Sequence, residues 1–405
     1  MNNIQKIKFS DLFLIPSKNG LTRPTSVRGQ GYRMVNMGEL FAYSFIGDIP
    51  MERVPMNERE LTIFTLNAGD LLFARQSLVL SGAGQCSYVE EQSEPTTFES
   101  HLIRIRLNPT LADSKFYYYL FKTPYSGITS IVRQCAQAGI RASDLSNLEI
   151  LYPNLNQQKQ IVKIISPYDD LIENNRRRIQ LLEEAARLLY QEWFVRLRFP
   201  GHEHTKIVDG VPEGWNCEIF PKIVEINPKT KVDSSSTIRY IPMSALNEGL
   251  MIIKHEEIEI REKSTNIKFK NNDVLFARIT PCLENGKTSF VNYLDESEVA
   301  CGSTEFIVFR GKMVSPYFVY CLSRTHDFRE NAIKSMIGSS GRQRVQNSCF
   351  SEYPILLAPQ KILDLFDSTI APLFTQIEIL DRENKNLIKA RDLLLPRLMN
   401  GVIPV

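Results

Sequence analysis

The sequence predicts an α+β protein: two tandem α/β globules, separated by two long helices that form an antiparallel coiled coil, in a pseudo-twofold internal repeat. Three observations support this prediction. The stretch NAGDLLFAR at 67–75 returns about 200 residues later as KNNDVLFAR at 270–278. Short stretches of alternating apolar residues in each half indicate strands. After each half comes a segment whose apolar residues recur at intervals of three and four, the spacing of a coiled-coil seam.

The repeat continues beyond this motif, and its offset stays near 200 residues. HLIRIRL at 101–107 and EFIVFR at 305–310 predict a strand in each half. Other segments also align: 84–89 with 286–291, and Gly139 with Gly341. Residues 114–123 match 315–325 and predict an aromatic helix opened by Ser with Lys or Pro, and 150–151 match 355–356, each of which closes a short strand. We expect the aromatic run Phe116–Tyr119 to lie in a core.

The first helical segment carries an uninterrupted seam: Ile161, Ile165, Tyr168, Ile172, Asn175, Ile179, Leu182, Ala186, Leu189 and Trp193. Ser166 and Pro167 have the pattern of an N-cap and a first helical residue. We therefore expect a short helix that leads into a long one near 167–198. Trp193 and Phe194, at its end, are expected to belong to a core.

The second seam is apolar at Phe366, Ile370, Leu373, Ile377, Leu380, Leu387, Leu394 and Leu398. Asn384 and Arg391 are polar interruptions. Two narrow seams most simply bury each other, and a twofold relation between the halves would make the pair antiparallel. Asn175 and Asn384 either set the register of this pair at a cost in stability, or are frayed and solvated positions. The sequence does not choose between these two interpretations.

These patterns divide the chain into five parts. We expect a first globule at 1–153, a central helical spacer at 154–200, a second globule at 211–357 and a C-terminal helical spacer at 358–405. A linker at 201–215 with Pro, Gly and His among its residues leads from the first helix into the second globule.

The composition is that of an ordinary globular protein, with 405 residues, 43% hydrophobic and 23% charged. The N-terminal stretch lacks the apolar core of a signal peptide, and no apolar run approaches a membrane-spanning length, so we expect a cytoplasmic protein. Seven cysteines without a C-x-x-C pair indicate reduced thiols. A net charge of +2 neither requires nor excludes nucleic acid. His202 and His204 flank Glu203 without a third ligand cluster, so we expect no metal site.

Catalytic motifs are missing from the sequence. An adenine methyltransferase needs a glycine-rich loop for its methyl donor and an Asn/Asp-Pro-Pro-aromatic tetrad for the flipped base. RGQGY at 28–32 and SGAGQ at 81–85 are lone glycine pairs, and no Pro-Pro dipeptide occurs. ENGKT at 284–288 carries only the last part of a nucleotide-binding loop, and we interpret it as a turn. These absences disfavour a stand-alone methyltransferase or nuclease, so we expect no catalysis by this chain alone.

Five segments carry a resemblance to one known family, in the right order along the whole chain. They are the run IVKIISPYDDLIENNRRRIQLLEEAARLLYQEWFVRLRFPGHE at 161–203, VPEGW at 211–215, LENGKT at 283–288, SSGRQRV at 339–345 and LLLPRLMNGVIPV at 393–405. Together with the GDLLFAR and NDVLFAR pair, they resemble the specificity (S) subunits of type I restriction-modification systems.

This resemblance implies that the globules are target-recognition domains, each of which reads one half of a bipartite, gapped DNA site in a bacterial or archaeal cell. The helices would set the distance between the half-sites and dock two methyltransferase (modification) subunits. Those subunits would methylate adenine with S-adenosylmethionine, and restriction/translocase subunits would use ATP and Mg, while this chain would hold no cofactor. An alternative is the specificity subunit of another methylation-based phage-defence system, without a translocating nuclease. A coiled-coil scaffold with no DNA role is a third class.

Base edges and phosphates are contacted by Arg, Lys, Gln, Asn, Ser and Thr, which we expect on loops. In the second domain the candidates are Ser340, Arg342, Gln343, Arg344, Arg278, Thr280 and Lys287. Gly341 permits a tight turn, and Arg and Gln are the bidentate readers of guanine and adenine. Arg342 or Arg344 could instead form a structural ion pair.

The first domain lacks LENGKT and GRQRV, and its candidates come from the matching positions: Arg75, Gln76, Arg133, Gln134, Gln137 and Arg141. Arg75 and Arg278 occur in both copies although the half-sites should differ. This favours phosphate anchoring or a role in folding over the reading of bases. The run Arg176–Arg178 could touch phosphates between the half-sites, or form a solvated face or a protein-docking patch.

Overall fold

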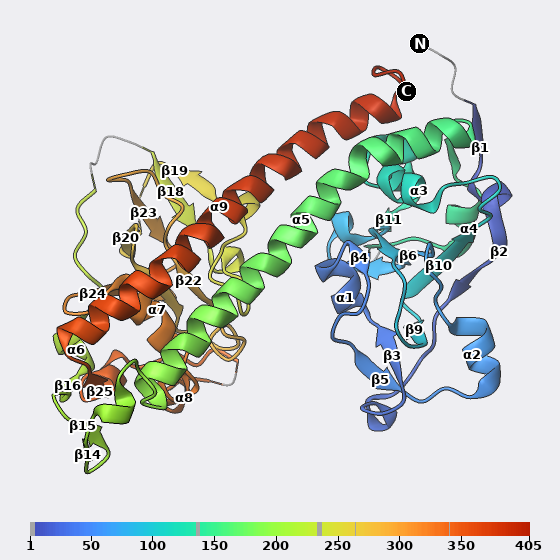
Figure 1. Cartoon of the computed structure of the whole chain (residues 1–405). Coiled ribbons are helices and arrows are strands. Elements are labelled where there is room, and N and C mark those ends of the chain that lie inside the picture. Colours follow the sequence, from blue (N-terminus) through green and yellow to red (C-terminus); the bar gives the residue numbers. More distant parts are fainter. Residues whose placement is uncertain (1–4, 135–137, 233–236, 264, 340) are drawn as a thin grey trace. The chain divides into compact units, whose positions relative to one another are not determined.

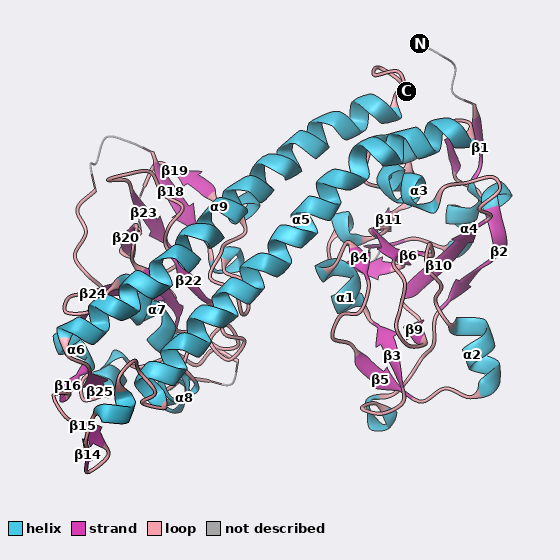
Figure 2. Cartoon of the chain, viewed as in Figure 1, coloured by secondary structure: helices cyan, strands magenta, loops and turns pink. Residues whose placement is uncertain are grey.

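The computed structural model describes residues 5–134, 138–232, 237–263, 265–339 and 341–405. The chain forms two compact units, Met1–Asp170 with Ile388–Val405, and Leu171–Leu387. Each unit combines one copy of the repeat with parts of two long helices, α5 (Leu155–Tyr190) and α9 (Gln360–Met399) (Figure 1). Within each globule, strands and short helices are mixed, as Figure 2 shows.

The first unit is built around a five-stranded sheet in the order β2-β10-β6-β8-β4, whose neighbours are antiparallel except for β4 and β8. Strand β6 is a run of four apolar residues that alternate between two cores. Leu71 and Phe73 face the core that contains the aromatic helix α3. Leu72 and Ala74 face a second core, which contains Phe98. Burial on both faces explains why this strand is apolar throughout.

The strands of the first unit are β1 (Lys6–Lys8), β2 (Phe13–Asn19), β3 (Tyr32–Val35), β4 (Phe45–Ile46), β5 (Glu52–Val54), β6 (Leu71–Ala74), β7 (Gln76–Ser77), β8 (Cys86–Val89), β9 (Thr96–Phe98), β10 (Leu102–Leu107), β11 (Arg133–Gln134), β12 (Ala138–Gly139) and β13 (Glu149–Leu151). Its short helices are α1 (Met37–Ala42), α2 (Glu58–Phe64), α3 (Ser114–Phe121) and α4 (Ala142–Ser146). Smaller sheets have the orders β5-β3-β9, β11-β12-β7 and β1-β13.

The second unit contains two four-stranded sheets, β17-β24-β21-β22 and β19-β18-β23-β20, and the pairs β14-β15 and β16-β25. Its strands are β14 (Ile207–Val208), β15 (Val211–Pro212), β16 (Asn216–Ile219), β17 (Val224–Ile226), β18 (Ile238–Ile241), β19 (Glu259–Arg261), β20 (Lys268–Lys270), β21 (Val274–Ala277), β22 (Thr288–Phe290), β23 (Val299–Gly302), β24 (Phe306–Gly311) and β25 (Pro354–Leu357). Its short helices are α6 (Phe220–Ile223), α7 (Pro316–Ser323) and α8 (His326–Lys334).

The predicted repeat is confirmed in its elements. The two copies of the motif form β6 and β21, the strands predicted at 101–107 and 305–310 form β10 and β24, and the aromatic stretches form α3 and α7. The order is also shared, because β10 lies between β2 and β6, as β24 lies between β17 and β21. The aromatic run Phe116–Tyr119 is buried, as predicted.

The helical restart predicted at Ser166 and Pro167 is wrong. Helix α5 is continuous from Leu155 to Tyr190, with Pro167 inside it. Proline lacks the N–H that donates to the preceding turn, which usually breaks a helix interior. Here the apolar seam continues across the proline, and Ile165 and Ile172 on either side of it are both buried. Tertiary packing of the seam therefore outweighs the local break signal. The helix is followed by a π-helical turn at Gln191–Val195.

The long helices run antiparallel, as predicted. In the second unit, the side chain of Asn175 donates to Glu383 at 3.1 Å. Further along the chain, the rings of Phe194 and Phe366 lie 4.8 Å apart between centroids. From the first contact to the second, the residue number rises from 175 to 194 along α5 and the turn after it, and falls from 383 to 366 along α9. The predicted seam residues of both helices are buried or partly buried, and Trp193 and Phe194 lie in a core.

The two asparagines of the seam are not solvated. Asn175 and Asn384 are 3% and 6% exposed, respectively. The side chain of Asn384 donates to the backbone carbonyl of Ile172 across the helix pair, at 3.3 Å. The interpretation as frayed, solvated positions is therefore wrong, and control of register stays a prediction. Among the helices that the structure describes, none has the sustained apolar stretch that a lipid bilayer requires.

Candidate nucleic-acid interface

In the first unit, the chain leaves β6 at Arg75 and meets a segment that lies far along the sequence. The backbone N–H of Arg75 donates to the carbonyl of His101 at 2.8 Å, and its carbonyl accepts from the N–H of Ile140 at 2.9 Å. Strand β7 then pairs with β12, so that Gln76 lies opposite Gly139. Strand β12 pairs in turn with β11. The structure thus brings parts of the two predicted contact segments together, because 76–77, 133–134 and 138–139 form one small sheet.

The predicted contact side chains of this sheet differ in their exposure to solvent and in their contacts within the protein. Arg75 and Gln76 are half-buried. Arg133 is exposed and forms an ion pair with Asp144 at 2.8 Å. Arg141 is exposed at the position before α4. Gln137 and the side chain of Gln134 lie outside the described residues. Contact with DNA by any of them stays a prediction.

The second unit repeats this arrangement. The N–H of Arg278 donates to the carbonyl of Glu305 at 2.9 Å, and its carbonyl accepts from the N–H of Val345 at 2.8 Å. Thr280 and Gln343 exchange two hydrogen bonds of 3.1 Å, one between backbone groups and one from the Gln343 N–H to the Thr280 hydroxyl. The segment around the predicted glycine turn therefore lies against the end of the motif in both domains.

Several predicted contacts of the second domain are engaged within the protein. Arg344 donates three hydrogen bonds of 2.7–3.0 Å to the Glu305 carboxylate, and this contact raises the pKa of Arg344. That geometry favours the alternative of a structural ion pair for Arg344. Lys287 donates to the carbonyl of Met243 at 3.2 Å, and Thr280 is buried. The turn predicted at 284–288 is confirmed at 284–286, and Thr288 begins β22.

Arg342 is placed differently from Arg344. It is exposed, and it follows Gly341, whose φ of +77° lies in the left-handed region that favours glycine. At Gly338, a Cβ atom would lie 2.9 Å from the carbonyl oxygen of Arg342, so the turn leaves no room for a side chain there. The turn therefore presents Arg342 at the surface. Ser340 lies outside the described residues.

The sequence analysis missed a pair of ion pairs that hold the motif. Asp70 accepts two hydrogen bonds from Arg106, each 2.7 Å long. Asp273 accepts two hydrogen bonds of the same length from Arg310. Both aspartates are fully buried. The sequence contains a pattern that could have predicted these ion pairs. Asp precedes the apolar run in both copies of the motif, and an Arg occurs in each paired strand, β10 and β24.

A buried acid of α5 ties the second domain to its helices. The Glu183 carboxylate accepts hydrogen bonds from the Tyr320 hydroxyl at 2.5 Å and from the Met251 N–H at 2.7 Å. Burial raises the pKa of Glu183, because desolvation disfavours its charged form.

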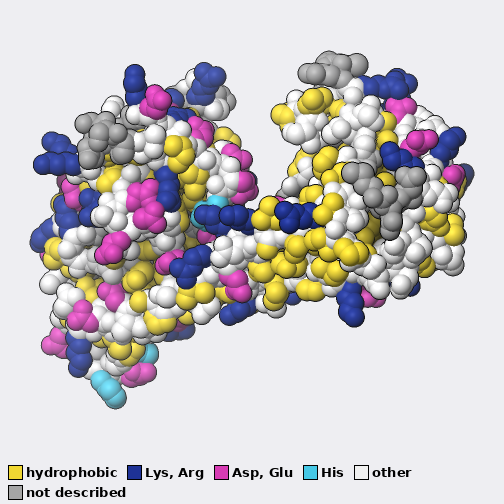
Figure 3. All heavy atoms as spheres, turned by 90° about the horizontal axis from the view of Figure 1, so that it is seen from above, with side chains coloured by type: hydrophobic (Ala, Val, Ile, Leu, Met, Phe, Trp, Pro, Cys, Tyr) yellow, Lys and Arg dark blue, Asp and Glu magenta, His cyan; other side chains and the backbone are white. Residues whose placement is uncertain are grey.

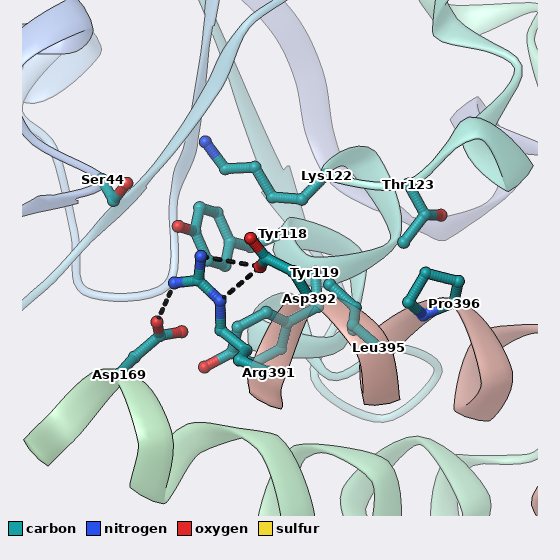
Figure 4. Close-up of a pocket in the computed structure, with 10 residues that line it drawn as sticks. All are labelled: Ser44, Tyr118, Tyr119, Lys122, Thr123, Asp169, Arg391, Asp392, Leu395 and Pro396. Carbon is teal, nitrogen blue, oxygen red and sulfur yellow. Dashed lines mark hydrogen bonds and ion pairs between the residues drawn. The ribbon is translucent and has the colours of Figure 1, made fainter. Parts of the chain in front are cut away.

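In the first unit, a cavity of about 310 Å³ lies between α3, α5 at Asp169 and the C-terminal part of α9 (Figure 4). Arg391 pairs there with Asp169 at 2.5 Å and with Asp392 at 2.8 Å. Lys122 lies 5.1 Å from the centre of the Tyr118 ring. None of the predicted DNA contacts lines this cavity. It marks the junction of the first domain with the helix pair.

Basic side chains do not form one continuous field on the face that Figure 3 draws, where Lys and Arg are interspersed with Asp and Glu. The predicted run Arg176–Arg178 is exposed on α5. Arg176 lies 3.6 Å from Glu173. Exposure agrees with each of the three roles considered for this run and does not choose between them.

Comparisons with known proteins agree with this architecture. The family model of the type I restriction modification DNA specificity domain matches residues 3–184 and again residues 217–390. The specificity subunit of the type I restriction enzyme MjaIX from Methanocaldococcus jannaschii is 24% identical over 369 residues, which span 87% of this chain and 83% of that protein. The specificity subunit of HindI from Haemophilus influenzae is 22% identical, over 84% of this chain and 87% of that protein. The solved S subunit of a type I restriction-modification system from M. genitalium shares the fold, with a TM-score of 0.55 at 16% identity over 98% of this chain and 97% of that one.

Proposed function

Because this chain belongs to the type I restriction modification DNA specificity domain family, we propose that it reads a bipartite, gapped DNA sequence. The domain at 1–153 reads one half-site and the domain at 211–357 reads the other. The helical spacers at 154–200 and 358–405 set the distance between the half-sites. Each domain recognises different bases through its own loops.

One observation carries this proposal: the two domains share a framework and differ at its tip. In both, the arginine at the end of the motif bonds through its backbone carbonyl to the segment beyond the turn, at 2.9 Å in the first domain and 2.8 Å in the second. The side chains that follow are unlike, with Gln76 and Ser77 in one copy and Ile279 and Thr280 in the other. A common framework with divergent polar tips suits two readers of different sequences.

The chemistry is assigned to partner subunits. Two methyltransferase subunits dock on the helices and methylate adenine with S-adenosylmethionine, and restriction/translocase subunits consume ATP with Mg. The chain itself works without a cofactor and without catalysis, in the cytoplasm. Readers that face the same side of the duplex require half-sites about one helical turn apart, on the order of 10 base pairs from centre to centre.

The test is to co-express the chain with the methyltransferase subunit encoded beside it and to sequence the modified adenines of the host genome. A gapped two-part motif is the expected result. Arg342→Ala should alter only one half of that motif, because Arg342 is exposed on the turn of the second domain. Lys206→Ala is the matched control, since Lys206 is also an exposed basic residue but lies in the linker. A continuous motif, or no methylation, would overturn the proposal. Co-purification of a restriction subunit tests the remaining partner.

A further inference from the structure

An apolar loop tip protrudes from the first domain beside its predicted DNA contacts. The side chains of Leu78, Val79 and Leu80 are 88%, 61% and 54% exposed, respectively. Large apolar side chains that gather at the surface of a soluble protein commonly mark an interaction site. This tip begins one residue after β7, the strand of Gln76.

The tip is a turn held by hydrogen bonds within the loop. The N–H of Val79 donates to the Ser77 hydroxyl at 3.2 Å, and the carbonyl of Val79 accepts from the N–H of Gly82 at 3.1 Å. A Cβ atom at Gly82 would lie 2.2 Å from the Ser77 hydroxyl oxygen, so a larger residue there would displace the Ser77 side chain that closes the loop. These contacts hold the base of the loop and leave the apolar side chains pointing to solvent.

The surroundings of the tip suit a polyanion. The loop continues from β7, whose neighbour β12 lies beside β11 with its exposed Arg133. The sequence has no acidic residue from Arg75 to Val89, and none from Tyr125 to Ser143. The two segments that form the small sheet therefore carry no carboxylate side chain, and Asp144 lies just beyond the second of them. An apolar protein partner would not require this lack of acids, whereas a DNA backbone repels acids.

We propose that Leu78–Leu80 enters a groove of the first half-site and makes apolar contact with its bases, with Leu78 as the leading side chain. This inference rests on the proposed function and adds a reading element to it. Apolar side chains that reach bases contact thymine methyl groups or wedge between base steps, and both modes bury the leucine. The second domain lacks this element, because Leu283 in its corresponding turn is buried.

The experiment uses the full chain in complex with its methyltransferase subunits and a duplex that carries the motif found by sequencing. Fluorescence anisotropy measures the Kd of Leu78→Ser, Leu78→Met and the control Ile207→Ser, which changes an apolar residue that is 54% exposed in the linker hairpin. Leu78→Ser should weaken binding about tenfold or more, because the buried apolar contact is lost. Leu78→Met should restore most of the affinity, and Ile207→Ser should leave it unchanged.

Two further readouts separate the modes of contact. Replacing thymine by deoxyuracil in the first half-site should reduce the difference between wild type and Leu78→Ser if methyl groups are touched. A 2-aminopurine probe should brighten with the wild type and stay dark with Leu78→Ser if a base step is opened. Either result supports the proposal.

Equal affinity of wild type and Leu78→Ser for the motif would overturn this inference and leave the two-reader function standing. Loss of complex assembly in Leu78→Ser, seen by size-exclusion chromatography, would show that the tip docks a protein and would also overturn it. A wild-type complex that binds no specific sequence would overturn both the inference and the proposed function.

Discussion

Arg278 and Val345 hold each other by two hydrogen bonds. The backbone carbonyl of Arg278 accepts from the N–H of Val345 at 2.8 Å, and the Arg278 guanidinium donates to the carbonyl of Val345 at 2.9 Å, across 67 residues of sequence. The arginine that ends the motif is thus a link between the sheet and the turn that carries Arg342. In the second domain, this geometry gives the arginine of the motif a structural role that is independent of DNA contact.

Removal of this link should destabilise the second unit. Arg278→Ala loses a charge-assisted hydrogen bond to a buried segment, and we expect a loss of about 1–2 kcal/mol. Urea unfolding followed by circular dichroism measures it. Arg382→Ala, at an exposed position of α9, should change the midpoint little. Equal midpoints for the two variants would contradict the structural role of Arg278.

The buried ion pair of the motif should contribute more. Asp273→Ala leaves the Arg310 guanidinium without its carboxylate, and we expect a loss of roughly 2–3 kcal/mol, less than for a fully buried pair because Arg310 keeps partial access to water. The matched control is Asp295→Ala, since Asp295 pairs with Arg239 but is 83% exposed. Urea unfolding measures both variants. If Asp295→Ala lost as much stability as Asp273→Ala, the predicted difference between the buried and the exposed ion pair would be refuted.

The stability of the second unit should depend on pH through Glu183. The folded protein raises the pKa of this carboxyl above its ordinary value of 4.5. The group therefore favours the folded state below that value, and this contribution is lost as the pH rises through the folded pKa. Glu183→Gln should show a flatter decline of stability above pH 4.5 than wild type. Thermal unfolding over a pH series measures this, and parallel curves would exclude Glu183 as the cause.

We predict that Asn384 fixes the register of the helix pair and lowers the stability of the protein. It is buried in the seam, and its side-chain oxygen has no hydrogen-bond partner among the described residues. Asn384→Leu should raise the unfolding free energy by about 1 kcal/mol, because an unsatisfied polar group is replaced by apolar packing. Lys385→Leu, at the exposed neighbouring position, is the control. A lower melting temperature for Asn384→Leu would show that its hydrogen bond to Ile172 is worth more than its burial costs.

Local patterns predicted the elements of this fold well. The apolar runs at 71–74 and 274–277 form strands, the aromatic stretches form α3 and α7, and the three-four seams are buried. Each of these follows from the periodicity of neighbouring side chains. Pro167 shows the limit of local reasoning, since the helix passes through it. A break signal acts over one turn, whereas the seam packs along the whole helix.

The sequence by itself determined the internal repeat, the strands and helices of each copy, the antiparallel helix pair and the family. Only the tertiary structure decided which arginines are engaged within the protein and which are presented at the surface. Arg342 and Arg344 stand two positions apart in one turn, yet Arg344 is held by Glu305 at 2.7 Å while Arg342 is exposed. The partner of Arg344 comes from 39 residues away. Such distant contacts depend on how the strands pair in space, which no local periodicity encodes.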